Sequence, residues 1–130
     1  MSQIVGIGID LIEVERVERA ITRPLTGARF CARVFTTGEV AYCESRGRPR
    51  YQSYAGRFAA KEATMKALGT GWNRNVGWGE IEVVRQRGHA PTINLSGKAA
   101  EFARKRGITR FHLSITHSAT TAMAHVVAEG

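Results

Sequence analysis

Hydrophobic and polar residues alternate near the start of the chain, over residues 4–13 (IVGIGIDLIE). This alternation predicts a strand, in which the aliphatic side chains at positions 5, 7, 9 and 11 share one face and Gly6, Gly8 and Asp10 share the other. Two glycines on one face of a strand mark a close approach by another backbone or by a ligand. Leu11 stands where a dinucleotide-binding G-x-G-x-x-G motif needs its third glycine, so the pattern excludes that motif.

Helical periodicity dominates the next part of the chain, and capping residues bound the predicted helices. Thr36, followed three residues later by Glu39, is the signature of a capping box, so a helix is predicted from there to Gly47. The predicted helices are VERVERA (14–20), TTGEVAYCESRG (36–47) and the central RFAAKEATMKALGTG (57–71), which ends at Gly69 or Gly71. The segment RGRPRYQSY (46–54) predicts a basic loop.

Strand-like alternation returns in the second half of the chain. The predicted strands are WGEIEVVRQ (78–86) and TINL (92–95), joined by a turn, then FHLSITH (111–117) and TAMAHVVA (121–128). Ser96 is the predicted N-cap of a helix over GKAAEFARKR (97–106), which Gly107 closes. This order predicts one α+β domain over residues 1–130, with a mainly antiparallel sheet and a long central helix.

The chain is strongly basic, with a net charge of +8 over 130 residues and 15 arginines among its 19 basic residues. That balance favours an anionic partner: nucleic acid, an acidic protein or a phosphorylated cofactor. A small basic nucleic-acid-binding protein is therefore the alternative to an enzyme. No helix-turn-helix, zinc-finger or aromatic RNA-binding motif supports that alternative.

The sequence carries no signal for a membrane or for secretion. No apolar run reaches the roughly 20 residues that span a bilayer, and the N-terminal segment lacks the basic region of a secretory signal. Cys31 and Cys43 do not have metal-binding spacing, and they predict reduced thiols in a cytoplasmic protein.

Polar side chains stand at the ends of predicted elements, where functional residues are common. Asp10 follows the alternating strand, Glu62 lies on the central helix, and His117 ends the LSIT strand. Two carboxylates suit Mg²⁺, which completes its octahedron with water and substrate phosphates. Lys66, one turn beyond Glu62, can reach the same phosphates, and the small residues around both predict room for them. Plainer roles stay open: Asp10 as a helix cap, and Glu62 with Lys66 as an exposed pair.

The chain resembles the holo-acyl-carrier-protein synthase family of 4′-phosphopantetheinyl transferases in four segments, which occur in the family's order: GIGIDLIEVERV, AGRFAAKEATMKALGTG, EIEV and HLSITHS. The resemblance covers nearly the whole chain. It implies transfer of the 4′-phosphopantetheine arm from coenzyme A to a serine of acidic apo-acyl carrier protein, in fatty-acid biosynthesis, with release of adenosine 3′,5′-bisphosphate. It also implies a need for Mg²⁺ and a homotrimer with active sites between subunits, with no membrane or nucleic-acid partner.

The resemblance also implies roles for single residues. Asp10 and Glu62 match the Mg²⁺-binding carboxylates, and Glu62, Lys66 and His117 match catalytic positions. The remaining matches are Arg57, Gly69, Thr70, Gly71 and Pro91 for coenzyme A, and Arg16 for the carrier protein.

The sequence departs from the family pattern in two places. The turn before Pro91 differs from the family's usual G-K-P, because two residues separate Pro91 from the preceding glycine. Glu80 stands where the family often has aspartate and is interpreted as structural. Two rivals within the class are a transferase for peptide or polyketide carriers and an inactive homologue. The short chain argues against the first, and the presence of both carboxylates and the lysine argues against the second.

Overall fold

The computed structural model describes residues 2–70 and 76–130, so the predicted coenzyme-binding residue Gly71 lies outside the described residues. Within them the elements run in the order β1 (Ile4–Glu13), α1 (Val14–Thr22), α2 (Gly27–Val34), α3 (Thr37–Glu44), α4 (Arg50–Leu68), η1 (Trp78–Glu80, a 3₁₀ turn), β2 (Ile81–Val84), β3 (Thr92–Leu95), α5 (Gly97–Lys105), β4 (Arg110–His117) and β5 (Thr121–Glu129). This is the predicted α+β arrangement. No helix of the described part is long and apolar enough to cross a membrane.

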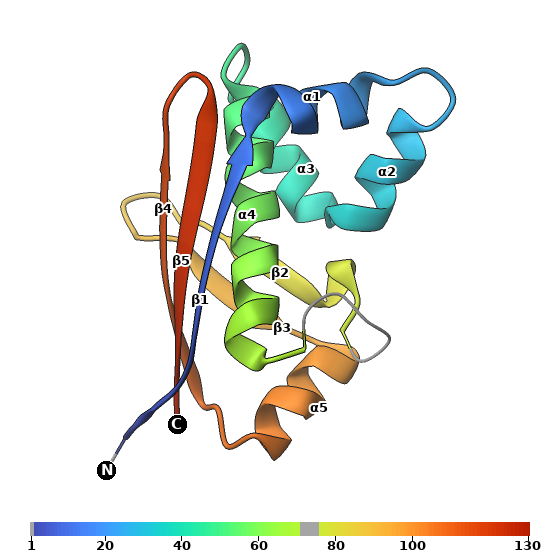
Figure 1. Ribbon diagram of the computed structural model, residues 1–130. Coiled ribbons are helices and arrows are strands. Elements are labelled where there is room, and N and C mark those ends of the chain that lie inside the picture. The colour runs from blue at the N-terminus through green and yellow to red at the C-terminus, as the bar shows by residue number, and fades with distance from the viewer. Residues whose placement is uncertain (1, 71–75) are drawn as a thin grey trace.

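An antiparallel sheet with the strand order β1–β5–β4 carries α4 along its inner face (Figure 1). Gly6 and Gly8 of β1 lie directly against this helix. A Cβ atom added to Gly8 would lie 1.8 Å from the carbonyl oxygen of Ala63, and one added to Gly6 would lie 2.0 Å from that of Ala67. The two glycines therefore mark the close approach of a helix backbone and not that of a ligand.

The small residues of α4 serve the same packing. Ala63 is fully buried and Ala67 is 2% exposed, and β5 presents the fully buried Ala124 and Ala128 on the inner face of the sheet. The sequence interpretation that these small residues make room for a metal and a pyrophosphate is therefore wrong for the alanines. Their size lets α4 pack close to the sheet, where any larger side chain would hold the backbones apart.

The predicted basic loop over residues 46–54 is wrong in its second half, because α4 begins at Arg50, directly after Pro49. Tyr54 explains the longer helix. Its ring is 5.0 Å from that of Phe35, and its hydroxyl donates a 2.7 Å hydrogen bond to the carboxylate of Glu44. These contacts stabilise the first turns of α4 from outside the segment. The hydrophobic pattern also did not predict α2.

The predicted helix caps are right in α3 and need correction in α5. The Thr36 hydroxyl accepts the backbone N–H of Glu39 at 3.1 Å, and the Glu39 carboxylate accepts the N–H of Thr36 at 2.9 Å, which completes the capping box. Ser96 occupies the N-cap position of α5, but its side chain makes no capping bond. The carboxylate of Glu80 accepts the N–H groups of residues 98 and 99 instead, which gives Glu80 a structural role.

The outer face of the sheet, away from α4, carries exposed hydrophobic side chains. Ile7, Ile9 and Leu11 of β1 are between 52% and 65% exposed. The strand register places residues 123, 125 and 127 of β5 beside them on this face. A hydrophobic sheet face that the chain leaves uncovered is typical of an interaction surface. We call Ile7, Ile9 and Leu11 the outer face below.

Candidate active site

Asp10, Glu62 and Lys66 come together where β1 meets α4, and we call these three residues the carboxylate cluster. Lys66 Nζ lies 3.3 Å from Oδ1 of Asp10 and donates a 2.9 Å hydrogen bond to the backbone oxygen of Ile9. The Asp10 side chain is 16% exposed, whereas that of Lys66 is 51% exposed. The ammonium group is thus anchored on the protein and still accessible to a ligand.

Glu62 adds a second carboxylate to this place. Burial raises the pKa of Glu62 and the negative charge of Asp10 raises it further, while the charges of Lys66 and Arg16 lower it. Arg16 of α1 therefore lies within electrostatic reach of the cluster. The plainer roles left open by the sequence do not describe these residues, because the N-cap of α1 is Glu13 and the ion pair of Lys66 is with Asp10.

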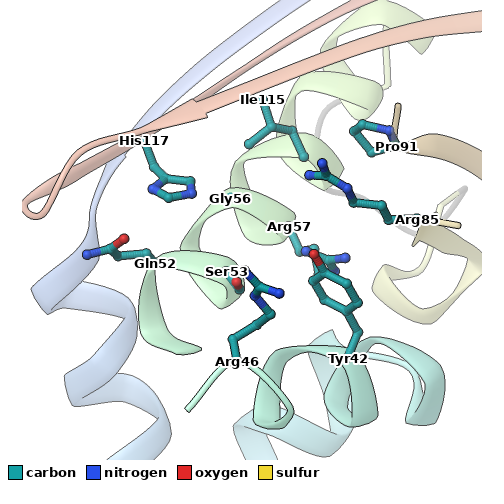
Figure 2. Close-up of a pocket in the computed structure, with 10 residues that line it drawn as sticks. All are labelled: Tyr42, Arg46, Gln52, Ser53, Gly56, Arg57, Arg85, Pro91, Ile115 and His117. Atoms are coloured by element: carbon teal, nitrogen blue, oxygen red, sulfur yellow. The ribbon is translucent and has the colours of Figure 1, made fainter. Parts of the chain in front are cut away.

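A second group of predicted residues lies on another side of α4, in a cavity of about 140 Å³ that we call the basic pocket (Figure 2). Arg57 and Pro91, predicted to bind coenzyme A, line it together with His117, predicted to be catalytic, and these roles stay predictions. The lining also includes Tyr42, Arg46 and Arg85, which the sequence did not predict as site residues. The two arginines lie in the basic runs RGRPR and RQRG, whose charge the sequence shows but whose position beside α4 it does not.

Arg57 is the buried cation of the basic pocket, at 5% exposed. Its guanidinium carbon lies 4.0 Å from the centre of the Tyr42 ring, which is a cation–π contact. Within the described residues its buried Nε has no hydrogen-bond partner. The guanidinium of Arg46 lies over the same ring at 5.8 Å. A buried guanidinium with a spare donor, beside further arginines, suits a phosphate group.

The helix α4 separates the carboxylate cluster from the basic pocket. Arg57 and Glu62 are five residues apart, so their side chains leave the helix about 140° apart. Asp10 lies on the edge strand β1 and His117 on the opposite edge strand β4, with β5 between them. One chain therefore presents the predicted site residues as two half-sites that face different directions.

Gly69 and Thr70 lie at the end of α4, one turn beyond Lys66. Gly69 closes the helix in the left-handed conformation, with φ at 84°, and its N–H donates to the backbone oxygens of Met65 and Lys66 at 3.0 Å. The N–H of Thr70 donates to the Met65 oxygen at 3.1 Å. These bonds hold the turn against the end of the helix that carries Lys66. A role of Gly69 and Thr70 in binding coenzyme A stays a prediction.

A hydrophobic cavity of about 340 Å³ adjoins Glu62 on its other side, and Phe30, Val34, Phe58 and Trp78 contribute to its wall. The rings of Phe58 and Trp78 stack with their centroids 5.1 Å apart. These apolar side chains reduce the contact of Glu62 with water, which is the burial that raises its pKa.

Similarity to known proteins identifies the family. Residues 6–122 match the model of the 4′-phosphopantetheinyl transferase superfamily. A holo-[acyl-carrier-protein] synthase of Solibacter usitatus is 49% identical over 126 residues, which cover 97% of this chain and 98% of the relative. The solved holo-[acyl-carrier-protein] synthase of Neisseria meningitidis superposes with a TM-score of 0.87 at 32% identity, covering 98% of this chain and 100% of that one. The enzyme of Helicobacter pylori in complex with coenzyme A gives 0.81 at 32% identity, covering 94% and 98%.

The chain belongs to the 4′-phosphopantetheinyl transferase superfamily. The family predicted from the four sequence segments is confirmed, and the relatives at near full length are holo-acyl-carrier-protein synthases. Of the two classes weighed from the sequence, a transferase and a nucleic-acid-binding protein, the family decides for the transferase.

Proposed function

We propose that this chain transfers the 4′-phosphopantetheine group from coenzyme A to a serine hydroxyl of apo-acyl carrier protein, in fatty-acid biosynthesis, and releases adenosine 3′,5′-bisphosphate. The carboxylate cluster carries the proposal, because it places two carboxylates and an anchored lysine together in a chain of this family. Transfer of a phosphoryl group depends mainly on positioning and on stabilisation of charge on the phosphate oxygens. The charged side chains of the two half-sites are suited to both tasks.

The donor set of the carboxylate cluster fits Mg²⁺. Asp10 and Glu62 supply carboxylate oxygens, which are the ligands that Mg²⁺ prefers, and a cation held by them would offset both the burial and the charge of Asp10 that raise the pKa of Glu62. No group of three or more His, Cys, Asp or Glu side chains gathers within the described residues, so water and substrate oxygens would complete the coordination. When bound, Mg²⁺ supplies a Lewis acid that neutralises charge on the pyrophosphate.

In the proposed reaction one phosphorus–oxygen bond forms and another breaks. The serine oxygen attacks the phosphorus that bears the pantetheine arm, and the bond from this phosphorus to the adenosine bisphosphate breaks. We assign the serine proton to Glu62 because its carboxylate lies in the carboxylate cluster, where the attacking serine would have to enter. Lys66, held by Asp10 and by the oxygen of Ile9, donates to the departing phosphate as its negative charge grows.

We further propose that the complete site forms between two copies of the chain. The basic pocket, with Arg57, Pro91 and His117, suits the nucleotide phosphates of coenzyme A, but α4 separates it from the carboxylate cluster of the same copy. A neighbouring copy can bring its basic pocket to the cluster of the first. Assembly would also cover the hydrophobic outer face, and we propose a homotrimer.

Arg16 is the residue that we assign to the carrier protein. It is exposed on α1, and its charge acts on Glu62, so a partner bound there would present its serine beside the carboxylate cluster. Acyl carrier protein is acidic, so this contact should weaken as salt screens it. We propose a cytoplasmic location for the reaction, in keeping with the free thiols of Cys31 and Cys43.

An intact-mass assay tests the proposed function. The protein is incubated with apo-acyl carrier protein, coenzyme A and Mg²⁺, with a parallel sample that contains EDTA. We expect the carrier to gain the mass of one phosphopantetheine group, and we expect EDTA to prevent the gain. An unmodified carrier in the Mg²⁺ sample would contradict the proposed reaction, and a gain that persists in EDTA would contradict the metal.

A further inference from the structure

The helix α4 carries two lysines whose surroundings are opposite. Lys66 is half exposed in the carboxylate cluster, whereas the Lys61 side chain is completely buried. Lys61 Nζ lies 2.8 Å from Oε1 of Glu39, whose side chain is equally buried. The proposed reaction uses neither member of this pair, so its place in the protein needs a separate explanation.

All hydrogen-bonding capacity of the ammonium group is used inside the protein. Besides Glu39, Lys61 Nζ donates to the backbone oxygen of Trp78 at 3.1 Å and to that of Ile81. On the other side of the pair, Oε2 of Glu39 accepts the N–H of Val83 at 2.7 Å, in addition to the N–H that Oε1 accepts in the capping box. The pair therefore joins α3, α4, η1 and β2 and leaves no donor for a ligand.

Stability alone does not account for a charged pair at this place. Burial lowers the pKa of Lys61. The charge of Glu39 and its hydrogen bond raise that pKa, but burial is the larger effect and the net shift is downward. Because both charges lose their water, a buried ion pair is generally no more stabilising than well-packed apolar side chains of the same volume. What the charged pair adds is direction, since its hydrogen bonds define where α3, η1 and β2 sit relative to α4.

On one side, the pair holds the wall beside Glu62. Lys61 directly precedes Glu62, and its ammonium binds the backbone of Trp78. The ring of Trp78 stacks on Phe58, and both rings line the hydrophobic cavity that adjoins Glu62. A shift of the Trp78 backbone would change the shape of this cavity and the burial of the Glu62 carboxylate.

On the other side, the pair holds the floor of the basic pocket. Arg57 lies one turn before Lys61 on α4, and Tyr42 lies one turn after Glu39 on α3. The guanidinium of Arg57 stacks on the Tyr42 ring at 4.0 Å. The helices α3 and α4 therefore make two contacts one turn apart, Glu39 with Lys61 and Tyr42 with Arg57. A change in the distance between α3 and α4 at Glu39 would therefore also move Tyr42 under Arg57.

We infer that Lys61 and Glu39 form a positioning pair, which holds the carboxylate cluster and the basic pocket in fixed orientation about α4. The inference rests on the proposed function, because it concerns residues of that active site. In an assembly, each α4 would have to present its two half-sites to different neighbours at once. A misplacement of about 1 Å lowers turnover by roughly 100-fold when reacting groups must align.

The test replaces the charged pair by a neutral pair, Lys61→Met with Glu39→Gln, so that no single charge stays buried. We expect a folded protein whose kcat per folded molecule falls about 10- to 100-fold and whose KM for coenzyme A rises by a smaller factor, because the basic pocket that the pair also holds shifts with α3. The same substitutions at an exposed pair on α5, Lys105→Met with Glu101→Gln, are the matched control and should leave kcat unchanged. A purely structural role predicts that the folded fraction changes and that kcat per folded molecule does not.

A second variant covers the case in which the neutral pair does not fold. Glu39→Asp keeps the charge but shortens the side chain by one methylene group, so the ion pair re-forms only if α3 moves. We expect an intermediate loss of kcat, measured well below the melting temperature. Wild-type kcat per folded molecule in either variant would overturn the inference. If the wild-type protein is inactive in the same assay, the proposed function fails. Failure of the proposed function is therefore distinguishable from failure of the inference about the positioning pair.

Discussion

The two sides of α4 differ in charge and in the chemical group that each is suited to bind. Toward β1, the carboxylate cluster combines two acids with one half-exposed lysine, which suits a metal-bound pyrophosphate. Toward β4, the basic pocket is lined by Arg46, Arg57 and Arg85, of which the first two lie over the ring of Tyr42, and this set suits a further phosphate. Coenzyme A carries both kinds of group on one molecule. Because α4 separates the two sides, a single copy contains both the carboxylate cluster and the basic pocket but does not place them around one shared site.

The largest effect is expected from Glu62, because the proposed mechanism gives it the roles of both metal ligand and base. Glu62→Gln keeps the size of the side chain and removes its negative charge. We expect kcat to fall by about 10²- to 10⁴-fold, measured by intact mass of the carrier. Near wild-type rates at saturating Mg²⁺ would remove Glu62 from the chemistry, and a circular dichroism melt serves as the control for folding.

The outer face gives the next test, since in the proposed trimer the assembly of copies is what brings the two half-sites together. Ile9→Lys places a charge in the centre of a surface that the proposed trimer buries. We expect the variant to elute as a monomer in size-exclusion chromatography and to lose most of its activity, because burial of an unpaired charge is costly. The control is Leu25→Lys, at a side chain that is 98% exposed outside the sheet. An Ile9→Lys trimer would contradict this interface.

Mixing two inactive variants asks directly whether the half-sites belong to different copies. Glu62→Gln damages the carboxylate cluster, and Arg57→Gln damages the basic pocket. In randomly mixed rings about a quarter of the interfaces join an intact cluster to an intact pocket, so about a quarter of wild-type activity should return. The measurement compares variants unfolded and refolded together with variants refolded separately. If mixing restores nothing, both half-sites act within one copy.

A smaller, selective effect is expected at Arg16, the residue proposed to dock the carrier protein. Arg16→Glu reverses a charge on α1 beside the carboxylate cluster. We expect KM for acyl carrier protein to rise about tenfold and KM for coenzyme A to change little, since rim charges mainly affect association. Added salt should reduce the difference between variant and wild type. An equal change in both KM values would remove Arg16 from the docking surface.

The smallest effect concerns stability and pH. The folded-state pKa of Glu62 lies above its ordinary value of 4.5, so between the two values the folded protein binds more protons than the unfolded chain. Stability contributed by this group is therefore lost as the pH rises through that range. We expect Glu62→Gln to melt at a higher temperature than wild type at pH 7 without Mg²⁺, and the difference to vanish on acidification to pH 4. A pH-independent difference would show that the carboxyl charge is not its cause.

Local patterns in the sequence were enough for most of the elements. The alternation over residues 4–13 predicted β1, and the capping box of Thr36 and Glu39 predicted the start of α3. These features are readable because they depend on neighbours within a few residues. The start of α4 was not readable in this way, because Tyr54 is held by Phe35 and Glu44 from other parts of the chain.

The same division applies to the site. The sequence by itself determined the family and the residue types, two carboxylates and a lysine at strand and helix positions that suit a phosphate reaction. Only the tertiary structure decided that Lys66 pairs with Asp10, that Tyr42 lies under Arg57, and that α4 separates the two half-sites. The reason is physical: spacing along one helix or strand specifies which face a side chain takes, but the partner on that face comes from packing between distant segments.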